Sequence, residues 1–408
     1  MQLPDDFIQQ TRQLFGDERF ERFVKALDSE APVSIRLNER KVPGAVPCEG
    51  TQVPWCEGGY YLSHRPVFTF DPLLHAGCYY VQEASSMFID RVLRQYVTHP
   101  VTMLDLCAAP GGKSTAARAA LPEGSMLVSN EPIRQRASIL AENIAKWGHP
   151  DSIVTNNYPR DFRKAKAQFD VILCDVPCSG EGMFRKDEGA VREWSLQNVE
   201  RCWQLQRDIV SEAWQCLRDG GLFIYSTCTF NTKENEENVR WMTEQLAAEV
   251  LPVATEAEWG ITGSLLDGFD EPVYRFIPGF TRGEGLFMAV MRKGAPNSLP
   301  QRERNDDARL AKALKGLNIL SNPLAMTGAE RSDTAVDLDY PTAISYLRGE
   351  ALVLPPEAPR GVVAVTFLHQ PLGFVKNIGN RANNLYPKEW RIKSTHIPQA
   401  YETILRLA

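Results

Sequence analysis

Between residues 100 and 293 the chain alternates short apolar runs with segments of helical periodicity. The apolar runs are residues 101–107, 126–130, 152–155, 170–175, 221–227 and 286–292. The segments that place apolar residues at helical spacing are 113–120, 132–147, 195–217 and 232–248. Continuous apolar strands separated by helices are typical of a mostly parallel sheet with both faces covered. The pattern predicts an α/β domain over residues 100–293.

The residues before this domain have a different pattern. Apolar residues recur at helical spacing within 3–28, which predicts a pair of short helices. Residues 30–82 are rich in Pro and Gly and include strand-like pieces such as 33–38. Residues 82–96 have the spacing of an amphipathic helix. We therefore expect residues 1–99 to form a small α+β lobe.

The residues after the α/β domain begin with a linker, 294–305, and continue as a third unit of short strands and helices over 306–408. The net charge of the whole chain is −6 at pH 7, which argues against a general basic coat for nucleic acid. Within the third unit, however, residues 371–393 hold five basic residues against one acidic residue. A local basic face is therefore compatible with the composition.

Nine cysteines are spread irregularly along the chain, and several lie within apolar runs. They include no Cys-x-x-Cys pair, so we expect neither a disulfide framework nor a metal site. Free thiols fit a reducing cytoplasm. The first residues are acidic and polar, and no apolar run reaches the roughly 18 residues that a membrane span requires. We therefore expect no secretory signal and no membrane segment.

A loop rich in small residues follows the first apolar run of the α/β domain. This glycine loop consists of Cys107, Ala108, Ala109, Pro110, Gly111, Gly112 and Lys113. In an open parallel sheet, ligands bind at the carboxyl ends of the strands, and small residues let backbone N–H groups approach a ligand closely. The end of the loop resembles a P-loop, but Cys107 stands where that motif requires Gly. No G-x-G-x-x-G motif for a dinucleotide occurs.

An acidic residue, Glu131, stands at the end of the second apolar run. At that position its carboxylate can accept hydrogen bonds from ribose hydroxyls, by the same logic as in dinucleotide sites. The alternative is that Glu131 only caps the helix that begins at Pro132. The glycine loop before it favours the ligand role.

Two cysteines, Cys178 and Cys228, follow two further apolar runs, and Asp175 precedes the first of them. Carbon 5 of cytosine is a poor nucleophile. A thiolate that adds to carbon 6 turns the ring into an enamine, whose carbon 5 can attack the methyl group of a sulfonium donor. A base then removes the carbon-5 proton, and a proton donor near ring nitrogen 3 stabilises the developing charge. The two thiols and the carboxylate therefore predict methylation of carbon 5 of a cytosine.

The alternative for each thiol is a structural role, because a free cysteine is usually buried as a small hydrophobic residue. That interpretation suits Cys174, Cys202 and Cys216, which lie inside an apolar strand or a helical segment. It is weaker for Cys178 and Cys228, which stand at strand exits beside Pro, Ser, Thr and Gly.

Taken together, these motifs resemble the RNA 5-methylcytosine methyltransferases of the NOL1/NOP2/Sun type, and among them the bacterial ribosomal-RNA enzymes of the RsmB/RsmF type. The resemblance covers most of the chain. It rests on residues 34–38, 80–86, 105–113, 130–131 with Arg136, 175–180 and 225–229. It implies a Rossmann-like core that uses S-adenosylmethionine, with an N-terminal α+β lobe and a C-terminal PUA-like α+β domain.

The resemblance also implies roles for single residues in catalysis. Cys228 would be the nucleophile and Cys178 would assist product release, whereas the DNA enzymes place the nucleophile at the Pro-Cys cysteine. Lys113 and Asp175 would line the catalytic pocket, with Asp175 close to both the donor methyl and the base.

Further residues would hold the donor. The backbone of the glycine loop would hold its methionine and ribose part, with Glu131 on the ribose hydroxyls and Arg136 and Asp175 nearby. The family often has Asp near the end of the third strand to meet the adenine amino group, and this chain has Asn157 there. An Asn side-chain oxygen can accept the same hydrogen bond.

Both outer units are expected to contact RNA. The expected residues of the N-terminal lobe are Arg36 and Asn38. In the tail, basic residues can meet phosphates and aromatic rings can stack on exposed bases. These residues are Lys376, Arg381, Tyr386, Lys388, Trp390, Arg391 and Lys393. The alternative is that the aromatic residues belong to the core and the charges to an ordinary solvated face.

The expected function is S-adenosylmethionine-dependent methylation of carbon 5 of a cytosine in ribosomal RNA, with 16S rRNA as the expected target. The partner would be ribosomal RNA or a ribosomal subunit, and we expect a cytoplasmic monomer. Two alternatives stay open. One is the same chemistry on tRNA or 23S rRNA, and the other is a non-catalytic RNA-binding factor of ribosome assembly. The intact thiols and glycine loop count against the non-catalytic factor.

Overall fold

The computed structural model describes residues 2–294, 298–301, 306–321, 335–394, 397–398 and 400–408. Within them, the central domain (residues 100–293) is built on a nine-stranded sheet. Its parallel strands are β6 (Thr102–Asp105), β7 (Met126–Asn130), β8 (Ser152–Thr155), β9 (Phe169–Asp175) and β10 (Leu217–Thr227). In the order β8-β7-β6-β9-β10, the direction of strand succession reverses between β6 and β9. Ligands of open α/β sheets bind at such a switch point, beyond the carboxyl ends of the strands.

Antiparallel strands complete both edges of this sheet. β13 (Leu286–Lys293) pairs with β10, and β11 (Ala248–Val250) and β12 (Val273–Phe276) pair with β13. At the other edge β14 (Ile319–Ser321) pairs with β8. We expected residues 306–321 in the third unit. They form helix α11 (Asp306–Leu314) and β14 instead, and both belong to the central domain. The expected linker, 294–305, lies partly outside the described residues.

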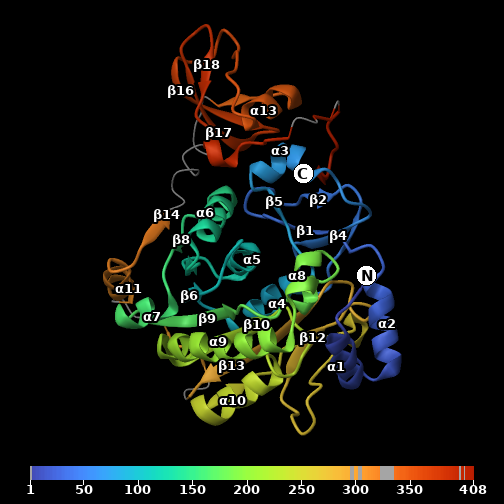
Figure 1. Ribbon diagram of the computed structural model, residues 1–408. Coiled ribbons are helices and arrows are strands. Elements are labelled where there is room, and N and C mark those ends of the chain that lie inside the picture. The colour runs from blue at the N-terminus through green and yellow to red at the C-terminus, as the bar shows by residue number, and fades with distance from the viewer. Residues whose placement is uncertain (1, 295–297, 302–305, 322–334, 395–396, 399) are drawn as a thin grey trace.

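Helices cover both faces of the sheet (Figure 1). One face carries α4 (Phe88–Tyr96), α5 (Gly112–Ala120) and α6 (Arg134–Trp147), and the other carries α7 (Pro159–Lys164), α9 (Leu196–Gln215) and α10 (Glu236–Leu246). Neighbouring strand residues point to opposite faces, so Met103 belongs to the first core and Leu104 to the second. The predicted α/β fold with a mostly parallel, doubly covered sheet is confirmed.

Two elements differ in extent from the prediction. The helix expected at 82–96 begins only at Phe88, because the residues before it form a polar turn. In that turn the Glu83 carboxylate accepts hydrogen bonds from the N–H groups of Ser85 and Ser86. β10 begins at Leu217 rather than at residue 221, because the chain turns directly from α9 into the strand.

The N-terminal lobe has two parts. Helices α1 (Asp5–Phe15) and α2 (Asp17–Leu27) form the expected pair, and their phenylalanines pack against Phe184 and Phe230 of the central domain. The second part is an antiparallel sheet in the order β3-β4-β1-β5. Its strands are β1 (Ser34–Leu37), β3 (Gly50–Gln52), β4 (Gly59–Leu62) and β5 (Tyr79–Val81).

The C-terminal domain contains a sheet in the order β15-β16-β17-β18 and helix α13 (Tyr340–Leu347). The strands are β15 (Val336–Asp337), β16 (Gly361–Phe367), β17 (Gln370–Asn377) and β18 (Ala382–Asn384). Residues of α13 share one buried cluster with helix α3 (Pro72–His75) and Tyr79 of the N-terminal lobe. The last strand, β19 (Leu405–Arg406), pairs with β2 (Val46–Pro47) of that lobe, so the end of the chain returns to its first domain (Figure 1).

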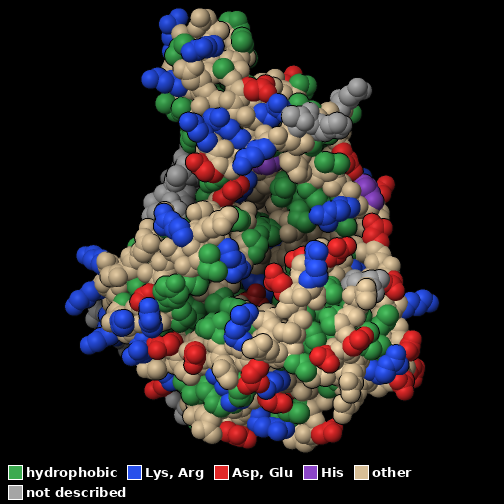
Figure 2. Space-filling model, viewed as in Figure 1, with side chains coloured by type: hydrophobic (Ala, Val, Ile, Leu, Met, Phe, Trp, Pro, Cys, Tyr) green, Lys and Arg blue, Asp and Glu red, His purple; other side chains and the backbone are tan. Residues whose placement is uncertain are grey.

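The described helices include none that is both long and apolar enough to cross a membrane. The remaining short helices are α8 (Glu188–Glu193) and the 3-10 turns at Phe68–Phe70, Ser85–Met87, Glu181–Met183, Ala257–Trp259 and Lys388–Trp390. Figure 2 shows that the face in view is hollowed between the C-terminal domain and helices α5 and α6.

Candidate active site

Three parallel strands deliver the candidate site residues to one edge of the sheet. β6 ends at Asp105 before the glycine loop, β9 ends at Asp175, and β10 ends at Thr227. Because Asp175 and Ser226 are paired neighbours, the segments that follow β9 and β10 leave the sheet side by side. The switch point and the three predicted motifs therefore coincide.

The glycine loop is held in place by helix α6. The Arg136 guanidinium donates a hydrogen bond to the Ala109 carbonyl at 3.0 Å, and the Asn143 amide donates to the Pro110 carbonyl at 2.8 Å. Gly111 adopts φ +116°, a region that disfavours residues with a side chain, and a Cβ there would lie 3.3 Å from Leu140. The loop thus leads into the first turn of α5. As in any helix, the backbone N–H groups of that turn have no partner within the helix.

Two buried carboxylates beside this loop each have an oxygen to which no residue in the described part of the chain donates a hydrogen bond. Asp105 is fully buried, and its Oδ2 accepts from the Ser114 hydroxyl at 2.6 Å while Oδ1 accepts from nothing. Glu131 is 1% exposed, and its Oε1 accepts from the Ile133 N–H at 3.0 Å while Oε2 has no donor. Burial raises the pKa of Asp105 to about 7.

The structure shows the capping role of Glu131, and its role in holding a ligand stays a prediction. Oε1 caps the start of α6, and Oε2 is left for a ligand, with the Arg136 guanidinium 3.4 Å away as its ion pair. Buried carboxylate oxygens without donors are costly. A ligand that brings hydroxyl or ammonium donors, as a ribose and an amino acid do, fits this edge of the sheet.

An ion pair lies between the glycine loop and the end of β9. The Lys113 ammonium lies 2.8 Å from Asp175 Oδ2, and the Ser226 hydroxyl donates to Asp175 Oδ1 at 2.6 Å. Burial lowers the pKa of Lys113, but the Asp175 carboxylate more than offsets this, and the pKa is raised above its ordinary value. Lys113 is therefore a cation at neutral pH.

The two predicted thiols face each other. The sulfur atoms of Cys178 and Cys228 are 3.1 Å apart, well beyond the roughly 2.05 Å of a disulfide, and both side chains are half-buried. The Cys228 N–H lies 3.3 Å from the Cys178 sulfur and donates to it. The hydrogen bond with the Cys228 thiol, and removal from water, raise the pKa of Cys178 well above its ordinary value. Cys178 is therefore a protonated thiol at neutral pH.

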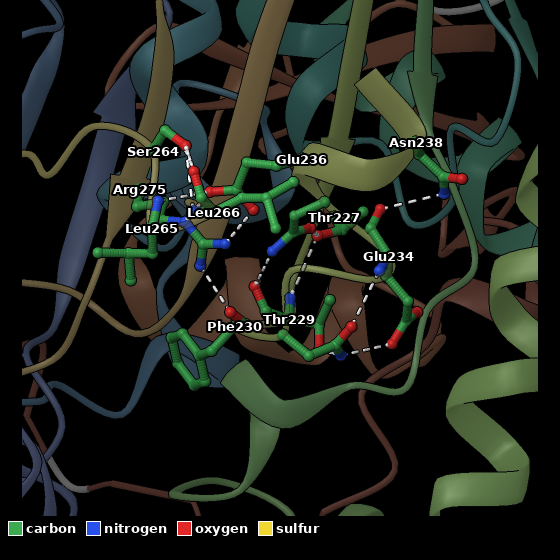
Figure 3. Close-up of polar contacts among 12 residues, drawn as sticks. Thr227, Thr229, Phe230, Glu234, Glu236, Asn238, Ser264, Leu265, Leu266 and Arg275 are labelled. Atoms are coloured by element: carbon green, nitrogen blue, oxygen red, sulfur yellow. Dashed lines mark hydrogen bonds and ion pairs between the residues drawn. The ribbon is translucent and has the colours of Figure 1, made fainter. Parts of the chain in front are cut away.

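The chain beyond Cys228 is fixed by a buried ion pair (Figure 3). Arg275 Nε donates to Glu236 Oε1 at 2.6 Å, and the second arm of the guanidinium contacts Glu236 Oε2. Arg275 Nη1 donates to the Phe230 carbonyl at 2.6 Å. Arg275 is 1% exposed and Glu236 is fully buried. One guanidinium thus ties the segment after the second thiol to β12.

Asn157 lies 9% exposed at the end of β8, but its side chain has a different use from the one expected. The side-chain amide donates to the Asn318 carbonyl at 3.2 Å, and Oδ1 accepts from the Asn318 N–H at 3.0 Å. Only the second lone pair of Oδ1 remains for the expected adenine contact. The amide joins the segment before β14 to the central sheet through one donor and one acceptor. A carboxylate has no donor, so it could make only one of these two hydrogen bonds.

Replacing Asn157 with Asp is therefore expected to weaken the attachment of residues 306–321. One carboxylate oxygen would face the Asn318 carbonyl without a proton between them, at a cost of about 1–3 kcal/mol. Faster amide hydrogen exchange in 306–321 would measure the loss. Asn380→Asp, at an exposed position, makes the same chemical change and serves as the control. Equal exchange rates in both variants would contradict this role of the Asn157 side chain.

The expected RNA contacts of the N-terminal lobe are corrected by their burial. Arg36 is 1% exposed, and it donates to Gln82 at 2.9 Å and stacks over the ring of Trp147 at 4.5 Å. Asn38 is 3% exposed and donates to the backbone carbonyls of Gly77 and Trp147, both at 2.9 Å. Both side chains join the lobe to the central domain, so neither is available to RNA.

The expected RNA contacts of the C-terminal domain divide into two groups. Lys376, Arg381, Lys388 and Lys393 are exposed, and their contact with phosphates stays a prediction. Tyr386 is 3% exposed and packs against Tyr346, which corrects the expectation that its ring stacks on an exposed base. Arg391 and Trp390 are half-buried.

Several residues around the thiols were missed by sequence reasoning. They are Glu181, Gln206, Ser226, Asn231 and Glu234, whose side chains bond to the two thiol-bearing segments or to Asp175. Their partners are up to 55 positions away along the chain, so spacing does not reveal them. The available signal is the polar run 231–238 shortly after a buried strand.

Three family models match the chain. The model described as 16S rRNA methyltransferase RsmB/F matches residues 96–292. The N-terminal domain of 16S rRNA methyltransferase RsmF matches residues 3–84, and the methyltransferase RsmF PUA domain matches residues 333–392.

Curated relatives of this chain carry the name ribosomal RNA small subunit methyltransferase F, and two of them are compared with it. The protein of Cronobacter sakazakii is 31% identical over an alignment of 463 positions, which covers 95% of this chain and 96% of the relative. The protein of Pectobacterium atrosepticum is 34% identical over 324 residues, which cover 73% and 64%.

Solved structures from Pyrococcus horikoshii share the fold. A methyltransferase homolog protein superimposes with a TM-score of 0.61 at 24% identity, covering 71% of this chain and 95% of its own. NSun6, solved with SFG, gives a TM-score of 0.59 at 19% identity, covering 72% and 99%. At these identities the likeness concerns the fold alone.

Proposed function

Because this chain belongs to the RsmB/F family of 16S rRNA methyltransferases, we propose that it methylates carbon 5 of a cytosine in 16S rRNA through a covalent bond between Cys228 and carbon 6 of the base. The methyl donor is S-adenosylmethionine, which supplies an electrophilic methyl group when bound. The observation that carries the proposal is the pair of free thiols 3.1 Å apart beside the glycine loop.

The proposed donor site consists of the glycine loop with Glu131, Arg136 and Asp105. Glu131 Oε2 and Asp105 Oδ1, to which no described residue donates a hydrogen bond, would accept from the donor's hydroxyl and amino groups. Arg136 holds the loop and neutralises Glu131. Asp175 lies between this site and the thiols, where it orients the Lys113 ammonium.

The proposed catalytic groups have separate tasks. Cys228 adds as a thiolate to carbon 6, and the ring gains negative charge on its nitrogen 3 and carbonyl oxygen. The Lys113 ammonium, kept protonated by Asp175, stabilises that charge. After methylation, the carbon-5 proton leaves to a base and the Cys228 sulfur departs as a thiolate. The Cys178 thiol, 3.1 Å away, donates a hydrogen bond to the departing sulfur.

The proposal is tested by supplying the purified chain with S-adenosylmethionine and either a 16S rRNA transcript or small ribosomal subunits. Bisulfite sequencing should then show one or more protected cytosines in the small-subunit RNA. Parallel reactions with tRNA and 23S rRNA test the alternative substrates. Donor binding by calorimetry without any methylated product in any of these RNAs would instead favour a non-catalytic assembly factor.

Cys178→Ala is expected to accumulate a covalent protein–RNA adduct. Without the thiol that stabilises the departing sulfur, release slows by about 10²-fold or more, while addition by Cys228 continues. The adduct appears as a slowly migrating band on a denaturing gel and disappears on RNase treatment. Cys202→Ala, which removes a thiol from α9, is the control. Absence of the band in an otherwise active preparation would remove Cys178 from product release.

A further inference from the structure

The two segments that bear the thiols are joined by a reciprocal pair of buried carboxylates. Glu181 follows Cys178 in the chain, and Glu234 follows Cys228. Each carboxylate reaches across to the segment that carries the other thiol. Glu181 is 2% exposed and Glu234 is fully buried. Among the described residues, neither forms an ion pair with a Lys or Arg side chain within 4.0 Å.

Glu234 holds the backbone beside Cys178. Its Oε2 accepts from the Ser179 N–H at 3.0 Å and from the Gln206 amide at 2.7 Å. The same Gln206 amide donates to the Pro177 carbonyl at 2.9 Å. The residues on both sides of Cys178 are therefore fixed by one carboxylate and one amide.

Glu181 holds the backbone beyond Cys228 in the same way. Its Oε2 accepts from the N–H groups of Phe230 and Asn231 at 2.6 and 3.1 Å. Its Oε1 accepts from the Trp194 indole at 3.0 Å. In addition, the Gly182 N–H donates to the Cys228 carbonyl at 2.7 Å. Residues of the segment that bears Cys178 therefore hold the backbone of the segment that bears Cys228.

The side chain of Asn231 joins the two carboxylates. Its amide nitrogen lies 2.9 Å from Glu181 Oε1 and 2.8 Å from Glu234 Oε1, and donates to both. Its Oδ1 accepts from the Glu234 N–H at 2.9 Å. The hydroxyls of Ser179 and Thr229, 2.8 Å apart, form one more link between the segments. Asn231 links Thr229 to Glu234, which are both drawn in Figure 3.

We propose that Glu181, Asn231 and Glu234 form a clasp that sets the relative position of the two thiols, with Glu234 positioning Cys178 and Glu181 positioning Cys228. This inference rests on the proposed function for the roles of the thiols. The three are positioning residues, since they touch the thiol-bearing backbone and not the reacting atoms.

The chemistry of the clasp requires carboxylates. Every group that faces the two oxygens of Glu234 is a donor, namely the Ser179 N–H and the amides of Gln206 and Asn231. A glutamine at 234 would direct its own NH₂ at one of these donors. Burial and the nearby Glu181 charge raise the pKa of Glu234 to about 7, so the clasp is held at a cost in electrostatic free energy. Buried carboxylates without a cation are typical of functional sites.

The two halves of the clasp should fail in opposite ways when each is changed separately. Glu234→Gln loosens Cys178 and is expected to raise the fraction of enzyme trapped as RNA adduct by about tenfold or more, as Cys178→Ala does. Glu181→Gln loosens Cys228 and is expected to slow adduct formation by about tenfold or more, so that neither adduct nor product accumulates. The probe is a 16S rRNA transcript with labelled S-adenosylmethionine, and both species are followed over time.

Two control variants separate positioning from general weakening. Glu237→Gln makes the same change of charge three residues beyond Glu234, on α10. No described hydrogen bond joins the Glu237 side chain to a segment that bears a thiol. Asp170→Asn loosens a buried network at the amino end of β9, where Asp170 accepts from Thr102 and Arg218. Both should keep the wild-type ratio of adduct to product, even where Asp170→Asn lowers the melting temperature. If the Glu234 and Glu181 variants kept that ratio too, the clasp would have no positioning role.

A second measurement does not depend on RNA. Diamide oxidises two adjacent thiols to a disulfide, as its N=N bond takes up the two hydrogens. The rate at which the Cys178–Cys228 linked peptide appears by mass mapping reports how well the two sulfurs are aligned. It should fall by about tenfold in both clasp variants and not in Glu237→Gln. Unchanged linking rates would overturn the clasp even if the chain methylated no RNA, whereas failure of the wild type to methylate any RNA would overturn only the proposed function.

Discussion

Cys228→Ala is expected to lose at least about 10⁴-fold of the methylation rate, because removal of a covalent nucleophile leaves only binding and electrostatics. The proposed donor site lies in the glycine loop and beside Glu131, so affinity for S-adenosylmethionine should stay within about twofold of wild type. Product is measured by labelled methyl transfer to small-subunit RNA, and donor affinity by calorimetry. No adduct band should appear, even with Cys178→Ala in the same chain.

The contrast between the two thiol variants decides which sulfur attacks. Cys228→Ala should leave neither product nor adduct, and Cys178→Ala should leave adduct with little product. The reverse assignment, as in enzymes that act on DNA, would give adduct only in Cys228→Ala. Full activity of Cys228→Ala would show that carbon 6 is not activated by this thiol at all.

Arg275→Met is expected to destabilise the central domain by about 3–5 kcal/mol, since it leaves the Glu236 carboxylate buried without a cation. The guanidinium is 1% exposed and also holds the Phe230 carbonyl, so its loss frees the segment that follows Cys228. Denaturant unfolding followed by tryptophan fluorescence measures the change.

Arg12→Met provides the matched control for this prediction. Arg12 also pairs with two carboxylates, those of Asp17 and Glu21, but its side chain is 41% exposed. Exposed pairs contribute roughly 0–1 kcal/mol, so this variant should unfold almost as wild type does. Equal destabilisation by the two substitutions would mean that breaking the buried Arg275–Glu236 pair lowers the free energy of unfolding no more than breaking an exposed pair.

The central domain was largely predictable because its strands are buried on both faces. Continuous apolar runs of four to seven residues that are separated by helical segments predict strands of a parallel sheet. The strands β6 to β10 follow that pattern. The start of α4 was not predictable in this way. Gln82 and Glu83 have helical spacing, but their side chains bond to Arg36 and to the following backbone, which removes them from the helix.

The site was predictable only where a short motif carries it. Cys178, Cys228, Asp175 and Lys113 lie in such motifs, and the structure brings them to one edge of the sheet. Arg36 was not predictable, because its charge and its position in a family motif favoured RNA, whereas its partners in the central domain bury it. One of them, Thr115, lies 79 positions away along the chain, a relation that no local pattern contains.

The pairing of β19 with β2 bears on how the protein is made. Translation proceeds from the first residue to the last, so the lobe containing Val46 is synthesised long before Leu405 leaves the ribosome. Until then β2 lacks its partner strand, and the apolar surface of the lobe that packs against helix α13 is uncovered. The central sheet has its six main strands within residues 102–293 and can form first. A nascent chain of this protein therefore carries an incomplete N-terminal lobe through most of its synthesis, with apolar surface that only the last residues to be made will cover.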